Sequence, residues 1–552
     1  MNIATVAKAF GRARRRVCNL VRPNVEITSP PNSILLEEDV PIAIRDGTVL
    51  RANVFRPYGG GRHPVLMSAH PYGKDYLPRK TRKGYRVFPN LRVLPQSKPF
   101  TISAWTGWEA PDPAYWVPRG YVVINADLRG WGRSDGVGDL FGPQEGDDYH
   151  DLIEWAAEQT WSTGRIGLTG VSYLAVSQWA AAATLPPHLT AICPWEGFTS
   201  LWDVARPGGV REDGLMMVWT HGTHRSRPEN PVDLREQQKT RPLRDDWWDA
   251  RDQALEKIKI PALVCASFSD HNLHSKGSFD GFQNIASTHK WMYTHRGPKW
   301  SEYYGPDGLA VQGRFFDHFL KGEENGQLEV PPIRLEVRTD ADSVTSLRYE
   351  HEWPPTATKW TRWWFHPDGR LDGSAPTASK QSFRMRGHGL HYSHCFDADT
   401  EIIGPMQARL SISLPNGGDA CLFVGVRKVR DGRTVAFEGA YGVRGSMITH
   451  GIRKASLHIA GFDGRPRDDV AQLLAPNQVV PVDVELMPSA TLFRAGEELQ
   501  VVVSGRWFYA RNPFTGQFPA YYEKSPRGLC SIHLGSAESG YLDVPVQAAA
   551  NA

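Results

Sequence analysis

The first clear pattern along the chain is a hairpin. Residues 42–55 (IAIRDGTVLRANVF) contain two runs in which apolar and polar residues alternate, joined by Asp46-Gly47. Alternation with a period of two is typical of strands, and Asp-Gly accepts the positive φ of a tight two-residue turn. The sequence therefore predicts two antiparallel strands here.

Several continuous apolar runs follow, each short enough for one strand. They lie at residues 64–70, 121–127, 165–170, 261–270 and 290–295. Such runs are typical of strands that are buried on both faces. Residues 148–160 and the alanine-rich 177–185 have helical spacing. This alternation of strand and helix predicts a parallel sheet covered by helices on both faces.

Two segments depart from that alternation. Residues 197–258 are rich in Trp, Arg and Asp and contain no buried-strand run, so we expect a helical insertion over the sheet. After about residue 326, short alternating runs are separated by Gly, Pro and Asp turns, and helical patterns nearly vanish. The last part of the chain is therefore predicted to be an antiparallel β-sandwich.

Composition limits the class of protein. A length of 552 residues exceeds one ordinary domain, and 41% hydrophobic with 22% charged residues is typical of a soluble globular protein. No apolar run approaches the roughly 20 residues that span a bilayer. The 63 basic and 60 acidic residues are scattered, so no nucleic-acid partner and no membrane partner are expected.

The cysteines and the N-terminus indicate a cytoplasmic protein. The six cysteines lie far apart and form no C-x-x-C pair, which favours buried thiols over disulfides. Residues 1–24 are basic but lack the apolar segment of a secretory signal. We expect a basic amphipathic surface helix there; a targeting or membrane-surface role is the alternative.

Ser172 is the candidate nucleophile. It lies in GVSYL (170–174), between a buried strand and a helix, which is the context of a nucleophile elbow. The start of a helix also favours developing negative charge. Leu174 stands where the G-x-S-x-G pattern has its second glycine. The alternative is a serine that only caps the helix.

Several longer motifs carry a family resemblance. They are RDGTVLRANVFRP (45–57), HPYGKD (70–75), ADLRGWGRSDG (126–136), WSTGRIGLTGVSYLAVSQWAAA (161–182), FFDHFLKG (315–322) and FRAGEELQVVVSG (493–505). From about residue 40 onward the chain resembles the cocaine esterase / X-Pro dipeptidyl-peptidase-like acyl hydrolases. That family includes α-amino-acid ester hydrolases and glutaryl-cephalosporin acylases.

The resemblance implies an α/β class fold: an α/β-hydrolase core, a helical cap inserted after the nucleophile, and a C-terminal β jelly-roll sandwich. With the residue patterns it gives the following division: 1–38, N-terminal extension; 39–196, first part of the core; 197–258, helical cap; 259–325, second part of the core; 326–552, jelly roll.

A serine nucleophile needs a histidine base and a carboxylate that orients the base. Asp270 ends the run 261–270, and the resemblance also points to it as the acid; a loop aspartate that binds its own backbone is the alternative. The chain order of this fold is Ser, acid, His. His295, at the end of the next strand, is the predicted base, although the G-P-W-x-H spacing common in the family is absent. His271 and His274 are set aside because they lie so close to Asp270 in sequence. A structural histidine packed under its loop is the alternative for His295.

The oxyanion of an acyl-transfer intermediate needs preorganised hydrogen-bond donors. One is expected from the backbone N–H of Tyr173, directly after the nucleophile. The resemblance implies that the second is the Tyr72 hydroxyl, in the P-Y motif that follows an early strand.

Substrate contacts are predicted from position. The long basic segment 73–114 leaves the sheet directly after Tyr72, and loops of this length are usually functional or disordered. Together with the cap it brings Trp105, Trp108 and Trp219 forward as residues of an apolar acyl pocket. The run of His388, His391, His394 and Cys395 lies beside glycines in the β-rich part, which favours a polar loop. We therefore predict no metal and no cofactor.

These features predict a serine hydrolase that cleaves carboxylic esters of small molecules through an acyl-enzyme. An amidase or peptidase of the same family is the alternative, since Asp203, Arg211, Glu212 and Asp213 could hold an amine or a carboxylate of the substrate. An inactive carbohydrate-binding protein is a remote alternative. The expected partner is a small-molecule ester or amide, and a homo-oligomer is compatible with the sequence.

Overall fold

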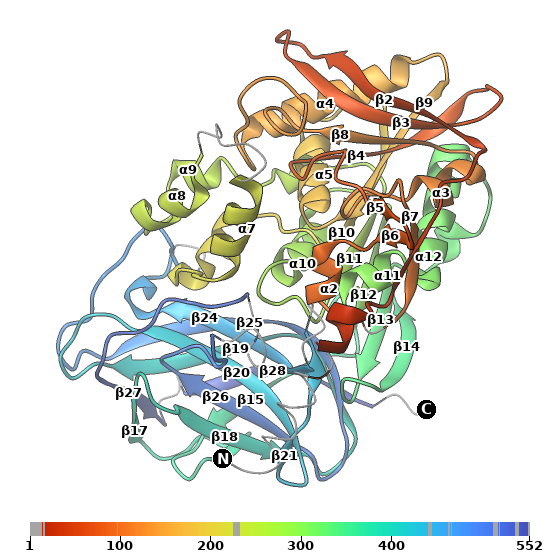
Figure 1. The fold of residues 1–552 in the computed structure, drawn as a ribbon. Helices are drawn as coiled ribbons and strands as arrows, with labels where there is room; N and C mark the ends of the chain where they lie inside the picture. Colours follow the sequence, from red (N-terminus) through yellow and green to blue (C-terminus); the bar gives the residue numbers. More distant parts are fainter. Residues whose placement is uncertain are drawn as a thin grey trace.

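The computed structural model describes residues 14, 17–96, 98–224, 232–439, 444–461, 464, 466–511, 517, 519–535 and 540–549. Most of the basic N-terminal stretch lies outside this range. Figure 1 shows an α/β part, coloured red to green, packed against a β-rich part coloured teal to blue. Among the described helices, none combines the length and the apolar character needed to cross a bilayer.

One ten-stranded mixed sheet organises the α/β part. In spatial order its strands are β2 (Ile34–Ala43), β3 (Val49–Pro57), β8 (Val122–Asp127), β4 (His63–His70), β9 (Ser162–Val171), β10 (Leu189–Trp195), β11 (Ala262–Ser267), β12 (Lys290–His295), β13 (Ile333–Arg338) and β14 (Val344–Glu350). The strands from β8 to β13 are parallel, whereas β3 and β14 run antiparallel to their neighbours. The β2–β3 hairpin and the buried parallel strands agree with the sequence patterns.

Helices cover both faces of this sheet. They are α4 (Pro143–Glu158), α5 (Tyr173–Ala183) and α10 (Ser275–Asn284) on one face, and α3 (Pro113–Trp116), α11 (Lys299–Tyr303) and α12 (Pro306–Phe316) on the other. Short 3-10 or π turns follow at η1 (Val117–Arg119) and η4 (Asp317–Lys321). Successive strand residues enter opposite cores: Met67 packs in the first and Leu66 in the second. Continuous apolar runs are therefore what a sheet buried on both faces requires.

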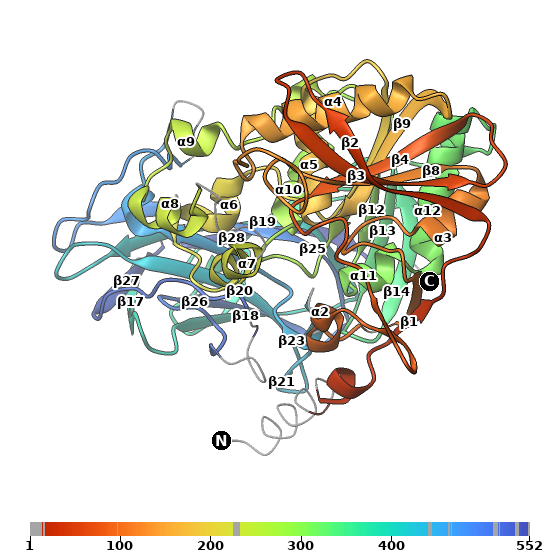
Figure 2. The ribbon, with the colours of Figure 1, turned by 45° about the horizontal axis from the view of Figure 1, so that its top comes forward.

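The predicted cap lies between β10 and β11. It contains α6 (Leu201–Ala205), η2 (Pro207–Gly209), α7 (Leu215–His224), α8 (Leu234–Thr240), α9 (Asp246–Asp249) and η3 (Leu255–Lys257). Figures 1 and 2 show α7 to α9 beside the β-rich part. Hydrogen bonds join the two: the Trp202 indole donates to Asp468 (3.0 Å), and the Asp213 N–H donates to the Tyr521 carbonyl (2.6 Å).

The segment after Tyr72 is folded into short elements rather than one open loop. These are β5 (Arg79–Thr81), β6 (Gly84–Arg86), α2 (Pro89–Val93) and β7 (Phe100–Ser103), the last of which pairs in parallel with β1 (Val25–Thr28). Apolar residues of this segment complete the second core.

The β-rich part is a sandwich of two antiparallel sheets around its own apolar core. One sheet contains β15 (Lys359–Phe365), β16 (Leu371–Asp372), β17 (Ser379–Arg384), β19 (Thr400–Ser413), β25 (Val480–Phe493), β27 (Leu529–Leu534) and β28 (Tyr541–Ala548). The other contains β18 (Leu390–Cys395), β20 (Cys421–Arg430), β21 (Arg433–Thr434), β24 (Thr449–Lys454) and β26 (Glu498–Ser504). Outside both lie β22 (Phe437–Glu438), β23 (Arg444–Ser446), η5 (Gln327–Glu329) and η6 (Ala455–Leu457).

Two details differ from the sequence expectations. Strands β13 and β14 extend the sheet of the α/β part, so this sheet continues beyond the expected boundary at residue 325, up to Glu350. Within the run 388–395, His391, His394 and Cys395 lie on strand β18 instead of in a polar loop, and His388 precedes the strand. Because successive side chains of a strand point to opposite faces, His391 and His394 cannot converge on one ion.

Candidate active site

Ser172 occupies the sharp turn between β9 and α5. Its φ of 63° and ψ of −116° lie outside the regions that L-residues ordinarily adopt, which is the strained geometry of a nucleophile elbow. Gly170 makes the turn sterically accessible, because a Cβ at that position would lie 2.4 Å from the Cβ of Leu174. The leucine that replaces the second motif glycine is therefore accommodated by the first.

His274 is the histidine that reaches Ser172. Its Nε2 lies 3.2 Å from the Ser172 Oγ, and its Nδ1 lies 2.5 Å from the Asp270 Oδ2. Asp270 ends the turn after β11, and the His274 N–H donates to the Asp270 carbonyl (3.0 Å), forming one helical turn before α10. Residues four apart on such a turn face the same side. Acid and base can therefore be close in sequence and still both serve one serine.

His295 does not reach Ser172 and lies in a separate buried pair. Its Nε2 is 3.0 Å from Glu196 Oε1, and its Nδ1 accepts the Gly297 N–H at 3.1 Å. Burial lowers the pKa of His295, but the carboxylates of Glu196, Glu302 and Glu336 together raise it above its ordinary value. The expectation for His295 rested on its position at a strand end. In the structure, a histidine at that position pairs with Glu196 instead of with Ser172.

Lys299, at the start of α11, is a buried cation beside Asp270 and His274. Its Nζ lies 2.7 Å from Asp270 Oδ2 and 2.9 Å from His274 Nδ1. An ammonium can only donate, so when Nδ1 carries its proton toward Asp270, Lys299 bonds the carboxylate and faces the imidazole as a neighbouring charge.

The electrostatics of this trio follow from burial and from Lys299. Burial lowers the pKa of His274 and the ammonium lowers it further, against the opposing effect of Asp270. Burial alone would raise the pKa of Asp270, but Lys299 and His274 hold it well below its ordinary value. The arrangement keeps His274 neutral and Asp270 ionised.

A Lys299→Met variant is expected to move the acid limb of the kcat/KM profile to higher pH. Removing the ammonium raises the pKa of His274, which must be neutral to accept a proton, and methionine fills a similar apolar volume. Steady-state hydrolysis measured across pH checks this. Lys276→Met is the matched control, since Lys276 pairs with Asp203 and Asp280 instead. An acid limb at its original pH, or at a lower one, in Lys299→Met would contradict the electrostatic role.

The two expected oxyanion donors lie beside Ser172. The Tyr173 N–H is the first of helix α5 and so has no acceptor within that helix. The Tyr72 hydroxyl lies within hydrogen-bonding reach of Ser172 and accepts the Trp219 indole N–H at 3.3 Å. Burial raises the pKa of Tyr72 well above its ordinary value, and nearby Glu109 raises it further. This hydroxyl therefore stays protonated and can donate a hydrogen bond.

Tyr72→Phe is expected to lower kcat by about 10²–10³ with little change in KM, because an oxyanion donor acts mainly in the transition state. Tyr76→Phe, in the same segment, is the control: its ring packs on Phe88 (5.1 Å). Initial-rate kinetics on one ester measures kcat and KM for both variants. An unchanged kcat in Tyr72→Phe would show that Tyr72 only packs against its neighbours.

Two further buried carboxyl groups border the site, Glu109 and Glu196. Burial raises the pKa of Glu109 to about 8, and the Trp300 indole donates to its Oε1 at 3.0 Å. Glu196 follows β10 and lies close enough to Asp270 and His274 that their polar atoms fall within 4.8 Å of one another. Both carboxyl groups contribute to the field that raises the pKa of Lys299, against the effect of its burial.

The tryptophans proposed for the pocket occupy different surroundings. Trp219, on α7, stacks on the ring of Tyr173 (5.9 Å between centroids) besides donating to Tyr72. Trp108 is buried against Trp300 (5.2 Å), and Trp105 packs on Phe55 (5.6 Å). Of the three, Trp219 has direct contact with the candidate oxyanion residues.

A metal would find two groups of ligand atoms in the described part of the chain. Glu196 joins either Cys265 with His295 or Asp270 with His274. The second group is the candidate acid and base, where the Lys299 ammonium already lies 2.7 Å from Asp270. A cation there would face a fixed positive charge, so this donor set suits proton transfer better than metal binding.

Comparison with known proteins defines the class of this fold and site. Residues 46–298 match the family model "X-Pro dipeptidyl-peptidase (S15 family)", and residues 325–543 match the "X-Pro dipeptidyl-peptidase C-terminal non-catalytic domain". The class is thus an α/β-hydrolase enzyme with a non-catalytic β domain. The crystal structure of a CocE/NonD family hydrolase from Staphylococcus aureus is 34% identical, covers 93% of this chain and 94% of its own, and superposes with a TM-score of 0.87. The chain belongs to the CocE/NonD family of hydrolases.

More distant relatives share this architecture. The cocaine esterase of Rhodococcus sp. (strain MB1 Bresler) is 25% identical over 607 aligned positions, which cover 92% of this chain and 98% of the esterase. The structure of an α-amino acid ester hydrolase is 15% identical, covers 94% of this chain and 97% of its own, and has a TM-score of 0.63. At that identity the likeness concerns the fold.

Proposed function

We propose that this hydrolase is a serine esterase that cleaves small carboxylic esters, with Ser172 as nucleophile, His274 as base and Asp270 as orienting acid. The observation that carries the proposal is the chain of contacts from Ser172 Oγ through both nitrogens of His274 to Asp270. Each group has the neighbour that its role requires.

Acylation uses each of these contacts in turn. The Ser172 Oγ attacks the ester carbonyl carbon while its proton passes to His274 Nε2, and the carbonyl oxygen becomes an oxyanion near the Tyr173 N–H and the Tyr72 hydroxyl. The intermediate then collapses: the carbon–oxygen bond to the alcohol breaks, and His274 returns its proton to the departing alcohol. An acyl group remains on Ser172.

Deacylation repeats the sequence with water. His274 Nε2 takes a proton from water as its oxygen attacks the acyl carbon, and the Ser172 Oγ leaves and recovers that proton. Asp270 holds the Nδ1 proton and stabilises the imidazolium in both halves. Lys299 positions Asp270 and keeps the resting imidazole neutral.

An ester is favoured over a peptide because the residues that could hold a substrate amine are engaged elsewhere. Glu212 is buried and accepts the backbone N–H groups of Gly214, Leu215 and Met216 at the start of α7. Asp213 pairs with Arg211 (2.7 Å), and Asp203 pairs with Lys276 (3.1 Å). The name of one relative, the cocaine esterase, supports the same choice. We further propose that Trp219 lines the acyl pocket.

A substrate panel tests this preference. Neutral p-nitrophenyl esters, amino-acid p-nitrophenyl esters and X-Pro p-nitroanilides would be compared by kcat/KM, with Ser172→Ala subtracting background hydrolysis. The proposal expects the neutral esters to have the highest value. A higher kcat/KM for the X-Pro anilide would assign the chain to the peptidase branch.

A further inference from the structure

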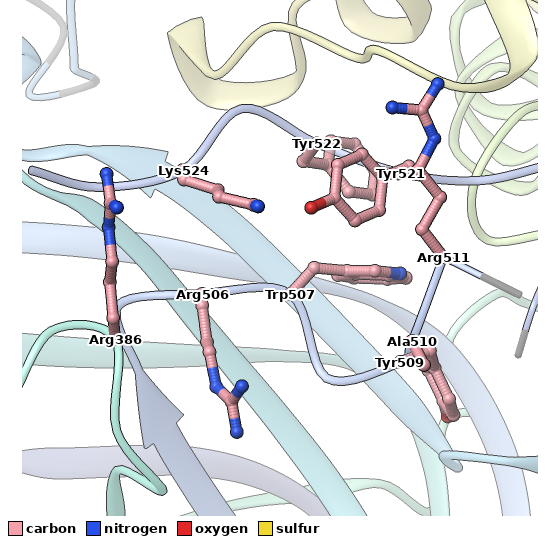
Figure 3. A pocket seen from close by; sticks show the side chains of 9 residues that line it. All are labelled: Arg386, Arg506, Trp507, Tyr509, Ala510, Arg511, Tyr521, Tyr522 and Lys524. Carbon is pink, nitrogen blue, oxygen red and sulfur yellow. The ribbon is translucent and has the colours of Figure 1, made fainter.

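A hollow lies in the β-rich part, beside the cap. It encloses about 250 Å³ (Figure 3). Four of its lining residues are cations (Arg386, Arg506, Arg511 and Lys524), and most of the others are aromatic. No carboxylate is among the described residues that line it. The hollow therefore combines positive charge with flat apolar surfaces.

Backbone carbonyl groups orient two of these cations. Arg386 donates its Nε–H to the Ser525 carbonyl, and Arg506 donates its Nε–H to the Gly387 carbonyl, both at 2.8 Å. Within the ranges that the structure describes, none of the four cations forms an ion pair with a carboxylate. Figure 3 shows Arg386 and Arg511 at opposite ends of the hollow, with Lys524 between them. An anion would thus meet positive charge on several sides.

Aromatic rings supply the apolar surfaces. Trp507 and Tyr522 are buried with their ring centroids 4.6 Å apart, and the Tyr521 ring lies 5.1 Å from the guanidinium of Arg511. The Trp507 indole N–H is buried and has no hydrogen-bond partner among the described residues. A buried donor beside unpaired cations is suited to an acceptor such as a carboxylate oxygen.

One tyrosine connects this hollow to the turn of residues 270–274, which contains Asp270 and His274 and is called the catalytic turn below. The Tyr522 hydroxyl donates to Asn272 Oδ1 at 3.1 Å, and Asn272 lies midway between Asp270 and His274 in sequence. The neighbouring Tyr521 N–H donates to Glu212 (3.1 Å), the residue that caps helix α7, which carries Trp219. Tyr521 and Tyr522 therefore line the hollow and also bond to Glu212 and to Asn272.

We propose that this hollow binds a small aromatic carboxylate and that, through Tyr522, its occupancy is coupled to the catalytic turn. The lining cations attract the carboxylate, and the rings of Trp507 and Tyr521 pack against the aromatic ring. The ligand is either a free molecule or the remote end of a substrate; both present the same chemistry to the hollow. The binding step does not depend on the esterase proposal.

Calorimetric titration of benzoate into the Ser172→Ala protein tests binding without hydrolysis. We expect one site, with affinity reduced at least about tenfold in Arg511→Gln/Lys524→Gln, since one tenfold step corresponds to the loss of a single charged contact. Lys359→Gln/Lys380→Gln on the sandwich removes the same net charge and should keep wild-type affinity. Cyclohexanecarboxylate and benzyl alcohol should each bind more weakly than benzoate. Equal benzoate affinity in the pocket variant, or equal affinity for either analogue, would overturn the proposal.

Two kinetic assays on the active protein separate the sources. If the ligand is a free molecule, benzoate changes the rate on p-nitrophenyl acetate, and Arg511→Gln/Lys524→Gln abolishes the change. If it is the remote end of a substrate, the same variant lowers kcat/KM for an ester with a benzoate arm and not for its neutral counterpart. An effect in neither assay would overturn the coupling to the catalytic turn.

Discussion

His274→Ala is expected to lower kcat by a factor on the order of 10⁶, as removal of the base does where serine, histidine and acid act as a unit. The substitution removes the imidazole nitrogen that lies 3.2 Å from the Ser172 Oγ and is placed to accept its proton. The variant should fold normally, because the lost ring leaves Asp270 still paired with Lys299 (2.7 Å). Steady-state kinetics on a p-nitrophenyl ester measures the loss, and thermal unfolding verifies the fold.

The matched comparison is the other buried histidine. His295→Ala leaves the Glu196 carboxylate buried without its cation, which costs about 3–5 kcal/mol of folding free energy. The folded fraction should nevertheless retain most of its kcat, and His295→Gln should recover part of the stability. If instead His295→Ala abolished kcat in a folded protein while His274→Ala remained active, the base would be His295.

Ser172→Ala is the second change with a very large expected effect, again on the order of 10⁶ in kcat. The attacking oxygen is lost, whereas the donors at Tyr72 and Tyr173 remain. Binding should therefore persist, and the KM or the Kd of a substrate analogue should change little. Alanine and serine are similarly strained at the positive φ of residue 172, so the free energy of unfolding should stay close to that of the wild type. Ser134→Ala serves as control, and a Ser172→Ala enzyme with undiminished turnover would remove the serine from the mechanism.

The fold could be predicted because its signals are local and repeated. Each parallel strand is a continuous apolar run, since alternate residues such as Leu66 and Met67 enter opposite cores. The elbow at Ser172 was equally visible as strand, serine and helix. The boundary after residue 325 was less predictable, because β13 and β14 have the same alternating pattern as the sandwich strands and differ only in their partners.

The histidine that reaches Ser172 could not be predicted from chain position. Two histidines follow Asp270 within four residues, and a third ends the next strand, where chain order favours a base. What distinguishes His274 is that the chain turns helically at once after Asp270, which places residues 270 and 274 on one face. The spacing of four was the available signal. This signal competes with the expectation that an aspartate and a histidine so close in sequence do not both serve the same serine.

The charged residues around His274, Lys299 and Glu109, were even harder to predict from the sequence. Lys299 belongs to R-G-P-K-W, where the family pattern has G-P-W-x-H, so the departure itself marked the position as unusual. Glu109 lies within a long irregular segment, and its burial depends on contacts with Trp300, far away in sequence. Burial of this kind is a property of tertiary packing.

The most direct test of the assignment is covalent labelling with a fluorophosphonate, followed by peptide mapping. The label reacts with a serine only when a base activates it. We predict an adduct on Ser172 in the wild type and in His295→Gln, and a loss of labelling in both Ser172→Ala and His274→Ala. An adduct on another serine, or undiminished labelling of Ser172 in His274→Ala, would contradict the Ser172–His274–Asp270 triad.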